Sequence, residues 1–194
     1  MGGKVASVKR TVGFLTVIEN QDQGLFGGFL LLNLAGRPLE FHCTAPIKPS
    51  RAQQILYGPT LQPYLFGEQI GQTLLSKAKK QPSLVCTDRQ PVLAVADHVD
   101  IPVVLVIPDE GSSTEEPQGG ENPDGCHWRV DGAHSTAEHL REFRFGDNRL
   151  AMPVGAESCE ARIQGELGEV IETFDLSEPF DRIRDAIKEA QRGA

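Results

Sequence analysis

The chain lacks any apolar run long enough to cross a bilayer. Its longest apolar run, Ile101 to Ile107, has the length of a strand, whereas a membrane-spanning helix needs about 20 apolar residues. The first ten residues, MGGKVASVKR, also lack the apolar segment of a secretory signal. We therefore expect a cytoplasmic protein with no membrane partner.

Paired cysteines are missing as well. The sequence has four cysteines, and no two of them form a C-x-x-C pair: Cys43, Cys86, Cys126 and Cys159. A zinc site usually takes two ligands from one such short turn. A disulfide framework is not expected in a chain without an export signal. We predict reduced cysteines, no bound metal and no other cofactor.

The second half of the chain contains a looser group of possible metal ligands. His127, His134 and His139 accompany Cys126 and Asp131. The histidines are separated by seven and five residues, which does not match the i, i+4 spacing of a helical metal-binding pair. This group therefore leaves the prediction of no metal unchanged.

Basic clusters and aromatic residues are scarce. The net charge is −8 and aromatic residues make up 6% of the chain. The densest basic group is Lys77, Lys79 and Lys80, at the end of a predicted helix, where cations interact favourably with the helix dipole. Nucleic-acid binding usually needs a basic face with aromatic side chains for the bases. We predict no nucleic-acid partner.

The sequence also lacks the common catalytic signatures. It has no G-x-S-x-G, no P-loop, no G-x-G-x-x-G, no deaminase zinc motif and no kinase motif set. This favours a non-catalytic module that binds a protein or a small ligand. The oligomeric state stays open.

Two strands with apolar residues on both faces are predicted near the N-terminus, over residues 8–19 and 24–32. Such strands lie in the middle of a sheet, covered on both sides. The second strand contains Gly24, Gly27 and Gly28. No Lys-Ser/Thr pair follows them, so we expect a bulge or a close backbone approach rather than a phosphate-binding loop.

A third strand, over residues 38–44, alternates in polarity after a turn. Leu39, Phe41 and Cys43 fall on one face, and the other face has Glu40, His42 and Thr44. We predict that the first set, including the Cys43 thiol, packs against the protein. The second set then faces solvent or a site.

Helices and parallel strands follow. Ser50 and Gln53 form a capping box that begins a short helix. A longer helix is predicted over 63–79, then strand 82–86, a short helix and strand 101–107, and such β-α-β order indicates a parallel pair. The expected fold is α+β: a mixed sheet with an N-terminal antiparallel β-β-β part followed by α-α-β-α-β, and helices packed against it.

Three regions are expected along the chain. Residues 1–107 form the α+β core, residues 108–125 are a flexible acidic insertion or linker, and residues 126–194 pack back onto the core. Within the last region we predict a strand over the sequence CHWRVDG, a short helix over the sequence STAEHLREFRF and a final helix from Ser177. The stretch 157–174 fits a helix or two short strands.

The first candidate catalytic group is the polar face of the third strand. A histidine near a carboxylate can act as a general base, which makes Glu40 and His42 candidates. A half-exposed strand with a polar outer face explains the same pattern without catalysis. His42 and Cys43 cannot form a dyad, because neighbours in a strand point to opposite faces.

The second candidate group is Cys86, Thr87 and Asp88, where a predicted parallel strand meets a helix. Open α/β sheets bind ligands at such strand ends, and a helix N-terminus can lower the pKa of a thiol. A buried cysteine followed by a helix cap is the alternative. The enzymatic hypothesis is therefore a hydrolytic or thiol-dependent enzyme using Glu40 and His42, or Cys86 with His42 or His98 nearby.

Overall fold

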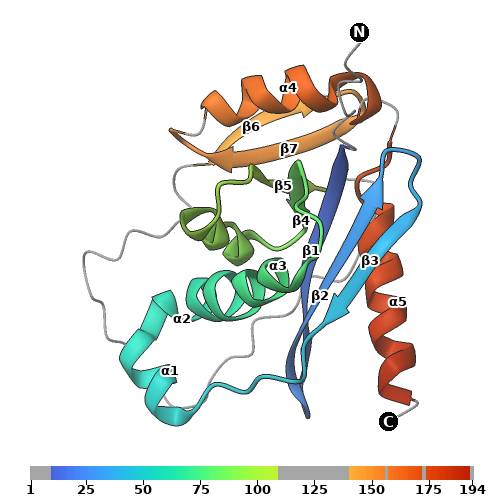
Figure 1. Cartoon of the computed structure of the whole chain (residues 1–194). Coiled ribbons are helices and arrows are strands. Elements are labelled where there is room, and N and C mark those ends of the chain that lie inside the picture. Colours follow the sequence, from blue (N-terminus) through green and yellow to red (C-terminus); the bar gives the residue numbers. More distant parts are fainter. Residues whose placement is uncertain (1–9, 109–139, 156, 172–173, 193–194) are drawn as a thin grey trace, which may run out of the picture.

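The computed structural model describes residues 10–108, 140–155, 157–171 and 174–192. Within them, seven strands form one mixed sheet in the order β3-β2-β1-β4-β5-β7-β6 (Figure 1). The strands are β1 (Thr11–Asn20), β2 (Gly24–Asn33), β3 (Pro38–Cys43), β4 (Leu84–Thr87), β5 (Val103–Ile107), β6 (Leu140–Phe145) and β7 (Asn148–Pro153). The predicted α+β fold with a mixed sheet is confirmed.

The strand directions follow the predicted order. β1 pairs with β2 and β2 with β3 in antiparallel fashion, whereas β4 runs parallel to β1 and β5 parallel to β4. β7 then pairs antiparallel to β5, and β6 to β7. The carboxyl ends of β1, β4 and β5 therefore lie at one end of the sheet, which is where α/β proteins commonly place ligands.

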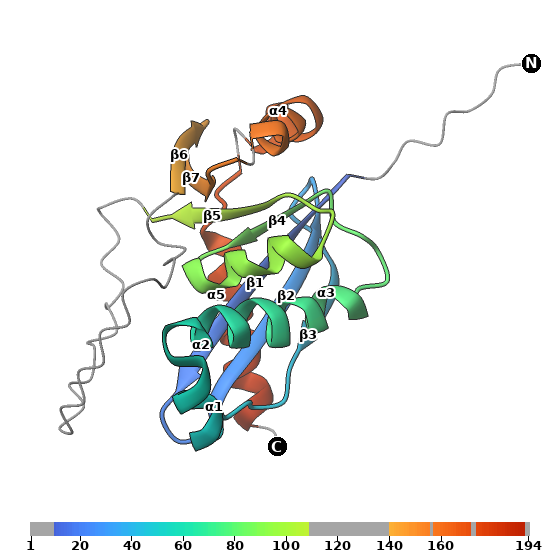
Figure 2. The same cartoon turned by 90° about the vertical axis from the view of Figure 1, so that its left-hand side faces the viewer.

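One face of the sheet is covered by the helical segments between β3 and β5 (Figure 2). They are α1 (Arg51–Tyr57), η1 (Gly58–Thr60), α2 (Leu61–Pro63), η2 (Tyr64–Gln72), α3 (Thr73–Lys77) and η3 (Gln90–His98). We call this set the helical layer. The η2 stretch is a π-helix, so α2, η2 and α3 continue one another over the length predicted for one long helix. Its side chains Leu65, Phe66, Ile70 and Leu74 are buried against this face.

The opposite face is covered by α4 (Glu157–Ile171) and α5 (Glu178–Arg192). The predicted stripe of α5 is buried: Phe180, Ile183 and Ile187 pack on the sheet. Phe180 meets Phe14 of β1 edge to face, with ring centroids 5.6 Å apart. Burial of these large apolar side chains holds α5 on the sheet.

Two adjacent glycines of β2 let helices approach both faces. A Cβ atom on Gly27 would lie 2.1 Å from Ile70 of η2, and one on Gly28 would lie 2.3 Å from Ile183 of α5. Real Cβ atoms do not come this close to other atoms. The predicted close approach to the strand backbone thus explains both glycines. The pairing of β2 with β1 continues through them without a bulge.

The last part of the chain corrects one prediction and decides another. Residues 140–145, predicted as the end of a helix, form strand β6. The alternation of Phe143 and Phe145 with charged residues fits a strand, and a turn with Gly146 at φ 59° returns the chain into β7. The stretch 157–171 is the helix α4, so the two-strand alternative is wrong. The predicted CHWRVDG strand lies outside the described residues.

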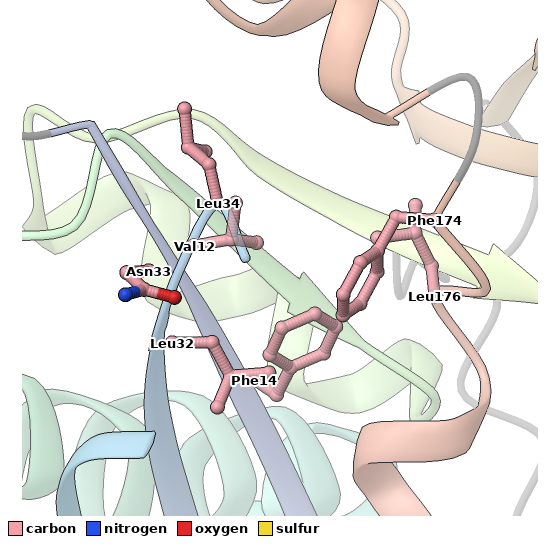
Figure 3. A pocket seen from close by; sticks show the side chains of 7 residues that line it. All are labelled: Val12, Phe14, Leu32, Asn33, Leu34, Phe174 and Leu176. Carbon is pink, nitrogen blue, oxygen red and sulfur yellow. The ribbon is translucent and has the colours of Figure 1, made fainter. Parts of the chain in front are cut away.

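A small cavity opens between β1, β2 and the segment before α5 (Figure 3). Its volume is about 10 Å³, which leaves room for one water molecule at most. The lining is Val12, Phe14, Leu32, Asn33, Leu34, Phe174 and Leu176. The Asn33 carboxamide oxygen already accepts the N–H groups of Ala35 and Arg37. We interpret this space as a packing gap, since it has neither the size nor the polar groups of a ligand site.

Within the described part of the chain, none of the helices has the length and apolar content that crossing a bilayer requires.

Candidate functional site

Glu40 and His42 are in direct contact on the edge strand β3. His42 Nε2 lies 3.2 Å from Glu40 Oε2, and the same oxygen accepts the N–H of Lys79 at 2.8 Å, just beyond the end of α3. The imidazole stacks on Phe29 of β2, with ring centroids 6.4 Å apart and planes inclined by 16°. Both side chains face the helical layer, and the carboxylate ties the end of α3 to the edge of the sheet.

The charge state of Glu40 follows from these contacts. Burial disfavours the carboxylate and raises its pKa. The N–H groups of Lys79 and Lys80 and the contact with His42 act in the opposite direction and prevail, so the pKa of Glu40 lies below its ordinary value of 4.5. Glu40 is therefore ionised at neutral pH and already accepts hydrogen bonds from the protein.

The prediction that Cys43 faces the packed side is wrong. Phe41 is 39% exposed and Cys43 is also exposed. A β-bulge places Glu40 opposite Leu31 and Pro38 opposite Leu32, so that Leu39 is the extra residue. Leu39 packs under the helical layer, whereas Phe41 and Cys43 lie opposite Leu30 and Gly28 on the α5 side and are exposed. The prediction assumed strict alternation across residues 38–44 and therefore did not include the bulge.

Thr44 completes the polar set with a structural contact. Its hydroxyl oxygen accepts the N–H of Gly27 at 2.9 Å, and its own N–H donates to the Gly27 carbonyl at 3.0 Å. Thr44 therefore extends the pairing of β3 with β2 beyond the last residue of the strand.

Cys86 does not have the environment of a nucleophile. It is fully buried in β4, on the face that α5 covers, and burial raises the pKa of its thiol far above the ordinary value of 9.0. Glu40 and His42 lie on the other face, with β2 and β1 between β3 and β4. A thiolate is therefore strongly disfavoured in this position, and the structure gives no support to thiol chemistry at Cys86.

The two polar residues after Cys86 hold local structure together. Thr87 is buried, and its hydroxyl oxygen accepts the N–H of Arg89 at 3.1 Å. The side chain of Asp88 is 12% exposed and forms an ion pair with Arg184 of α5. Asp88 therefore fastens α5 to the end of β4, at the strand end where the sequence predicted a site.

A second carboxylate–histidine pair lies within the helical layer. Glu68 Oε1 of η2 and His98 Nε2 of η3 are 3.9 Å apart, and both side chains are well exposed. His98 is thus not a partner of Cys86, which faces α5. No sequence pattern pairs Glu68 with His98, because η2 and η3 meet only in the folded chain.

Residues 41–87, which contain the helical layer except η3 together with the adjoining loops, differ in charge from the rest of the chain. Residues 41–87 contain five Lys or Arg residues and one acid, Glu68. All five cations are exposed: Lys48, Arg51, Lys77, Lys79 and Lys80. The net charge of −8 does not reveal this local excess of cations, because it sums the charges on both faces of the sheet and in the acidic segments.

The short helix α1 presents apolar and aromatic side chains to solvent. None of its seven residues is buried, and Ile55 and Leu56 are 69% and 81% exposed. Tyr57 stacks on Tyr64 of η2, with ring centroids 4.3 Å apart and planes inclined by 25°. The contact with Tyr64 raises the pKa of Tyr57 above its ordinary value of 10.0. The Tyr57 hydroxyl therefore stays neutral at physiological pH.

Among the described residues, no three His, Cys, Asp or Glu side chains lie close enough together to hold a metal ion. The possible ligands Cys126, His127, Asp131, His134 and His139 lie outside those residues. The exposed aromatic and apolar side chains of α1 are the feature that sequence reasoning missed. Their signal was a predicted helix in which Ile55, Leu56 and Tyr57 are consecutive, so that one face of the helix cannot bury all three.

Comparison with known proteins finds a likeness among solved structures. No family model matches the chain, and no curated protein matches it. Among solved structures, the chain is similar to Endonuclease V from Ciona intestinalis in complex with a DNA that contains an inosine followed by a ribo-adenosine. The identity is 12%, the TM-score is 0.44, and the match covers 95% of this chain and 88% of that one. At these values the likeness assigns no activity to this chain.

The same comparison contradicts two predictions from the sequence. One was a non-catalytic module for a protein or a small ligand, and the other was the absence of a nucleic-acid partner. The similar structure is an Endonuclease V in complex with DNA, which conflicts with both predictions, and neither is kept. The second rested on the total charge and the low aromatic content, neither of which describes a single face of the molecule.

Proposed function

We propose that the protein binds nucleic acid through the exposed cations of the helical layer. The observation that carries this proposal is the charge of residues 41–87, which have five exposed Lys or Arg residues against one acid in a chain of net charge −8. Phosphate contacts by such cations supply most of the affinity of sequence-independent nucleic-acid binding.

The positions of these cations also support the proposal. Lys48 and Arg51 flank the start of α1, and Lys77, Lys79 and Lys80 follow along the end of α3. Within the described part of the chain, none of these five cations forms an ion pair, and the Lys48 ammonium donates to the backbone carbonyl of Asp22. By contrast, all four cations of α5 pair with acids of the same helix: Arg182, Arg184, Lys188 and Arg192. Cations that no carboxylate neutralises are the ones free to meet phosphates.

The experiment is a fluorescence-anisotropy titration of the full chain with a labelled 20-nucleotide DNA strand and with the matching duplex, at several salt concentrations. We expect binding that weakens as salt rises, because phosphate contacts release counterions. The double variant Arg51→Glu with Lys80→Glu should bind at least tenfold more weakly at low salt and show a shallower salt dependence.

The matched control reverses the same number of charges away from the helical layer, in Arg144→Glu with Lys188→Glu. Both residues are exposed, on β6 and α5. We expect this control to lose less than threefold in affinity. An absence of binding by the unmodified chain at low salt would overturn the proposal, as would equal losses in the two double variants.

We also propose a cytoplasmic location. It is supported by the absence of disulfides among the described cysteines Cys43, Cys86 and Cys159, because thiols stay reduced in that compartment. Fractionation of cells that express the full-length tagged chain tests this, and recovery from an exported fraction would contradict it.

A further inference from the structure

We infer that the nucleic acid bound by the helical layer is single-stranded and that its unpaired bases contact Tyr57 and Leu56 of α1. This inference rests on the proposed function and adds the class of nucleic acid and the side chains that meet the bases. The exposure, order and charge of α1 support it.

The exposed side chains belong to a well-ordered helix. The Ser50 hydroxyl oxygen accepts the N–H of Gln53 at 3.2 Å, and the Gln53 side chain returns to the N–H of Ser50 at 2.9 Å. At the other end, Gly58 adopts φ 50° and donates its N–H to the Gln54 carbonyl. Because α1 is capped at both ends, it is a folded helix. The exposure of Ile55 and Leu56 is therefore a property of the fold and does not come from an unfolded segment.

Tyr57 is also held in place. Its stack on Tyr64 connects the end of α1 to the start of η2, so the ring loses little freedom when a ligand arrives. The stack covers one face of each ring, and neither tyrosine is buried. A rigid, partly exposed aromatic ring beside an exposed Leu provides the flat apolar surface on which a base stacks.

The charge around α1 selects a nucleic acid as the occupant. No Asp or Glu occurs between Glu40 and Glu68, whereas Lys48 and Arg51 are exposed at the start of the helix. An exposed apolar surface beside uncompensated cations complements a chain of bases linked by phosphates.

The same surface distinguishes single strands from duplexes. In a duplex, each base has both faces covered by its neighbours, so side chains reach only base edges. Unpaired bases offer their faces to aromatic and apolar side chains. Contacts through Tyr57 and Leu56 are therefore made only by an unpaired segment, and cation–phosphate contacts are made by both forms.

The test compares the 20-nucleotide strand with its duplex at one salt concentration, for the unmodified chain and for the double variant Tyr57→Ala with Leu56→Ala. We expect the strand to bind at least fivefold more tightly than the duplex. The double variant should lose about tenfold for the strand, as removal of a stacking side chain does, with an unchanged salt dependence and little loss for the duplex. Tyr57→Phe should retain the binding of the strand, because the ring is kept.

Val154→Ala is the matched control, since Val154 is also an exposed apolar residue but lies at the end of β7. It should bind the strand as the unmodified chain does. Equal affinity for strand and duplex would overturn this inference alone, as would unchanged strand binding by the Tyr57 and Leu56 variant. If neither form binds, the proposed function fails as well, so the two failures are distinguishable.

Discussion

The two faces of the sheet are packed equally closely against helices, but the helices that cover them present different surfaces to solvent. On both faces a glycine of β2 admits an isoleucine: Gly27 meets Ile70 of η2, and Gly28 meets Ile183 of α5. The α5 helix buries its apolar stripe and pairs its cations with acids. The helical layer leaves α1 and five cations exposed. Tight packing is therefore common to the two faces, and the unpaired charge distinguishes them.

Polar residues on the two faces show the same distinction. Glu40 fastens the end of α3 on one face, and Asp88 fastens α5 on the other. Glu40 was a catalytic candidate because it shares a strand face with His42, and Asp88 because it lies at the end of a parallel strand. In the structure each carboxylate holds a helix to the sheet, so a polar residue at such a position is a weak sign of chemistry when it can bind a helix.

The largest effect is expected for valine at the paired glycines. Gly27→Val and Gly28→Val should each lower the free energy of unfolding by about 3 kcal/mol, because an added side chain overlaps Ile70 or Ile183. Urea denaturation measures both. Gly165→Ala in α4, where a Cβ atom meets nothing within 4 Å, should instead raise stability by about 0.5–1 kcal/mol. A mild effect at Gly27 alone would show that the helical layer yields more easily than α5.

A smaller effect is expected for the ion pair that fastens α5. Asp88→Asn should lower the free energy of unfolding by about 1–2 kcal/mol, because the Arg184 guanidinium loses its less exposed partner. Asp181→Asn is the control, since that carboxylate binds the same guanidinium but is largely exposed. It should cost under about 0.5 kcal/mol. Equal losses in urea denaturation would contradict the fastening role of Asp88.

The smallest effect is expected at Glu40 and depends on pH. The pKa of Glu40 is lowered in the folded chain, so its carboxylate stabilises the fold above the ordinary value of 4.5 and ceases to do so as the pH falls through the folded pKa. Glu40→Gln should cost about 1 kcal/mol at pH 7 and progressively less toward pH 3. Glu19→Gln, at an exposed position of β1, is the control. A difference between Glu40→Gln and the unmodified chain that persists unchanged at pH 3 would contradict this account.

Periodicity and capping predicted most of the fold. The apolar strands, the Ser50 capping box and the stripe of α5 appear where their patterns indicate, because each depends on residues close together in sequence. The β6–β7 pair was missed because a short helix was predicted over the sequence STAEHLREFRF, whereas residues 140–145 gain strand pairing at the sheet edge. That gain is tertiary, and local patterns do not report it.

The candidate site was harder to predict for the same reason. The bulge at Leu39 reverses the faces of β3, and only its pairing with β2 reveals it. The contacts of Asp88 with Arg184 and of Tyr57 with Tyr64 join residues brought together by folding. The net charge was the least informative feature for predicting the partner. It does not show that residues 41–87 contain five exposed cations and one acid.

The most direct test of the difference between the two faces is to map a bound oligonucleotide by NMR. Amide resonances of the isotope-labelled full chain would be followed while the 20-nucleotide strand is added. The account predicts that the resonances of α1 and of the start of η2 shift and that those of α5 do not. Shifts confined to α5, or no shifts at saturating oligonucleotide, would contradict it.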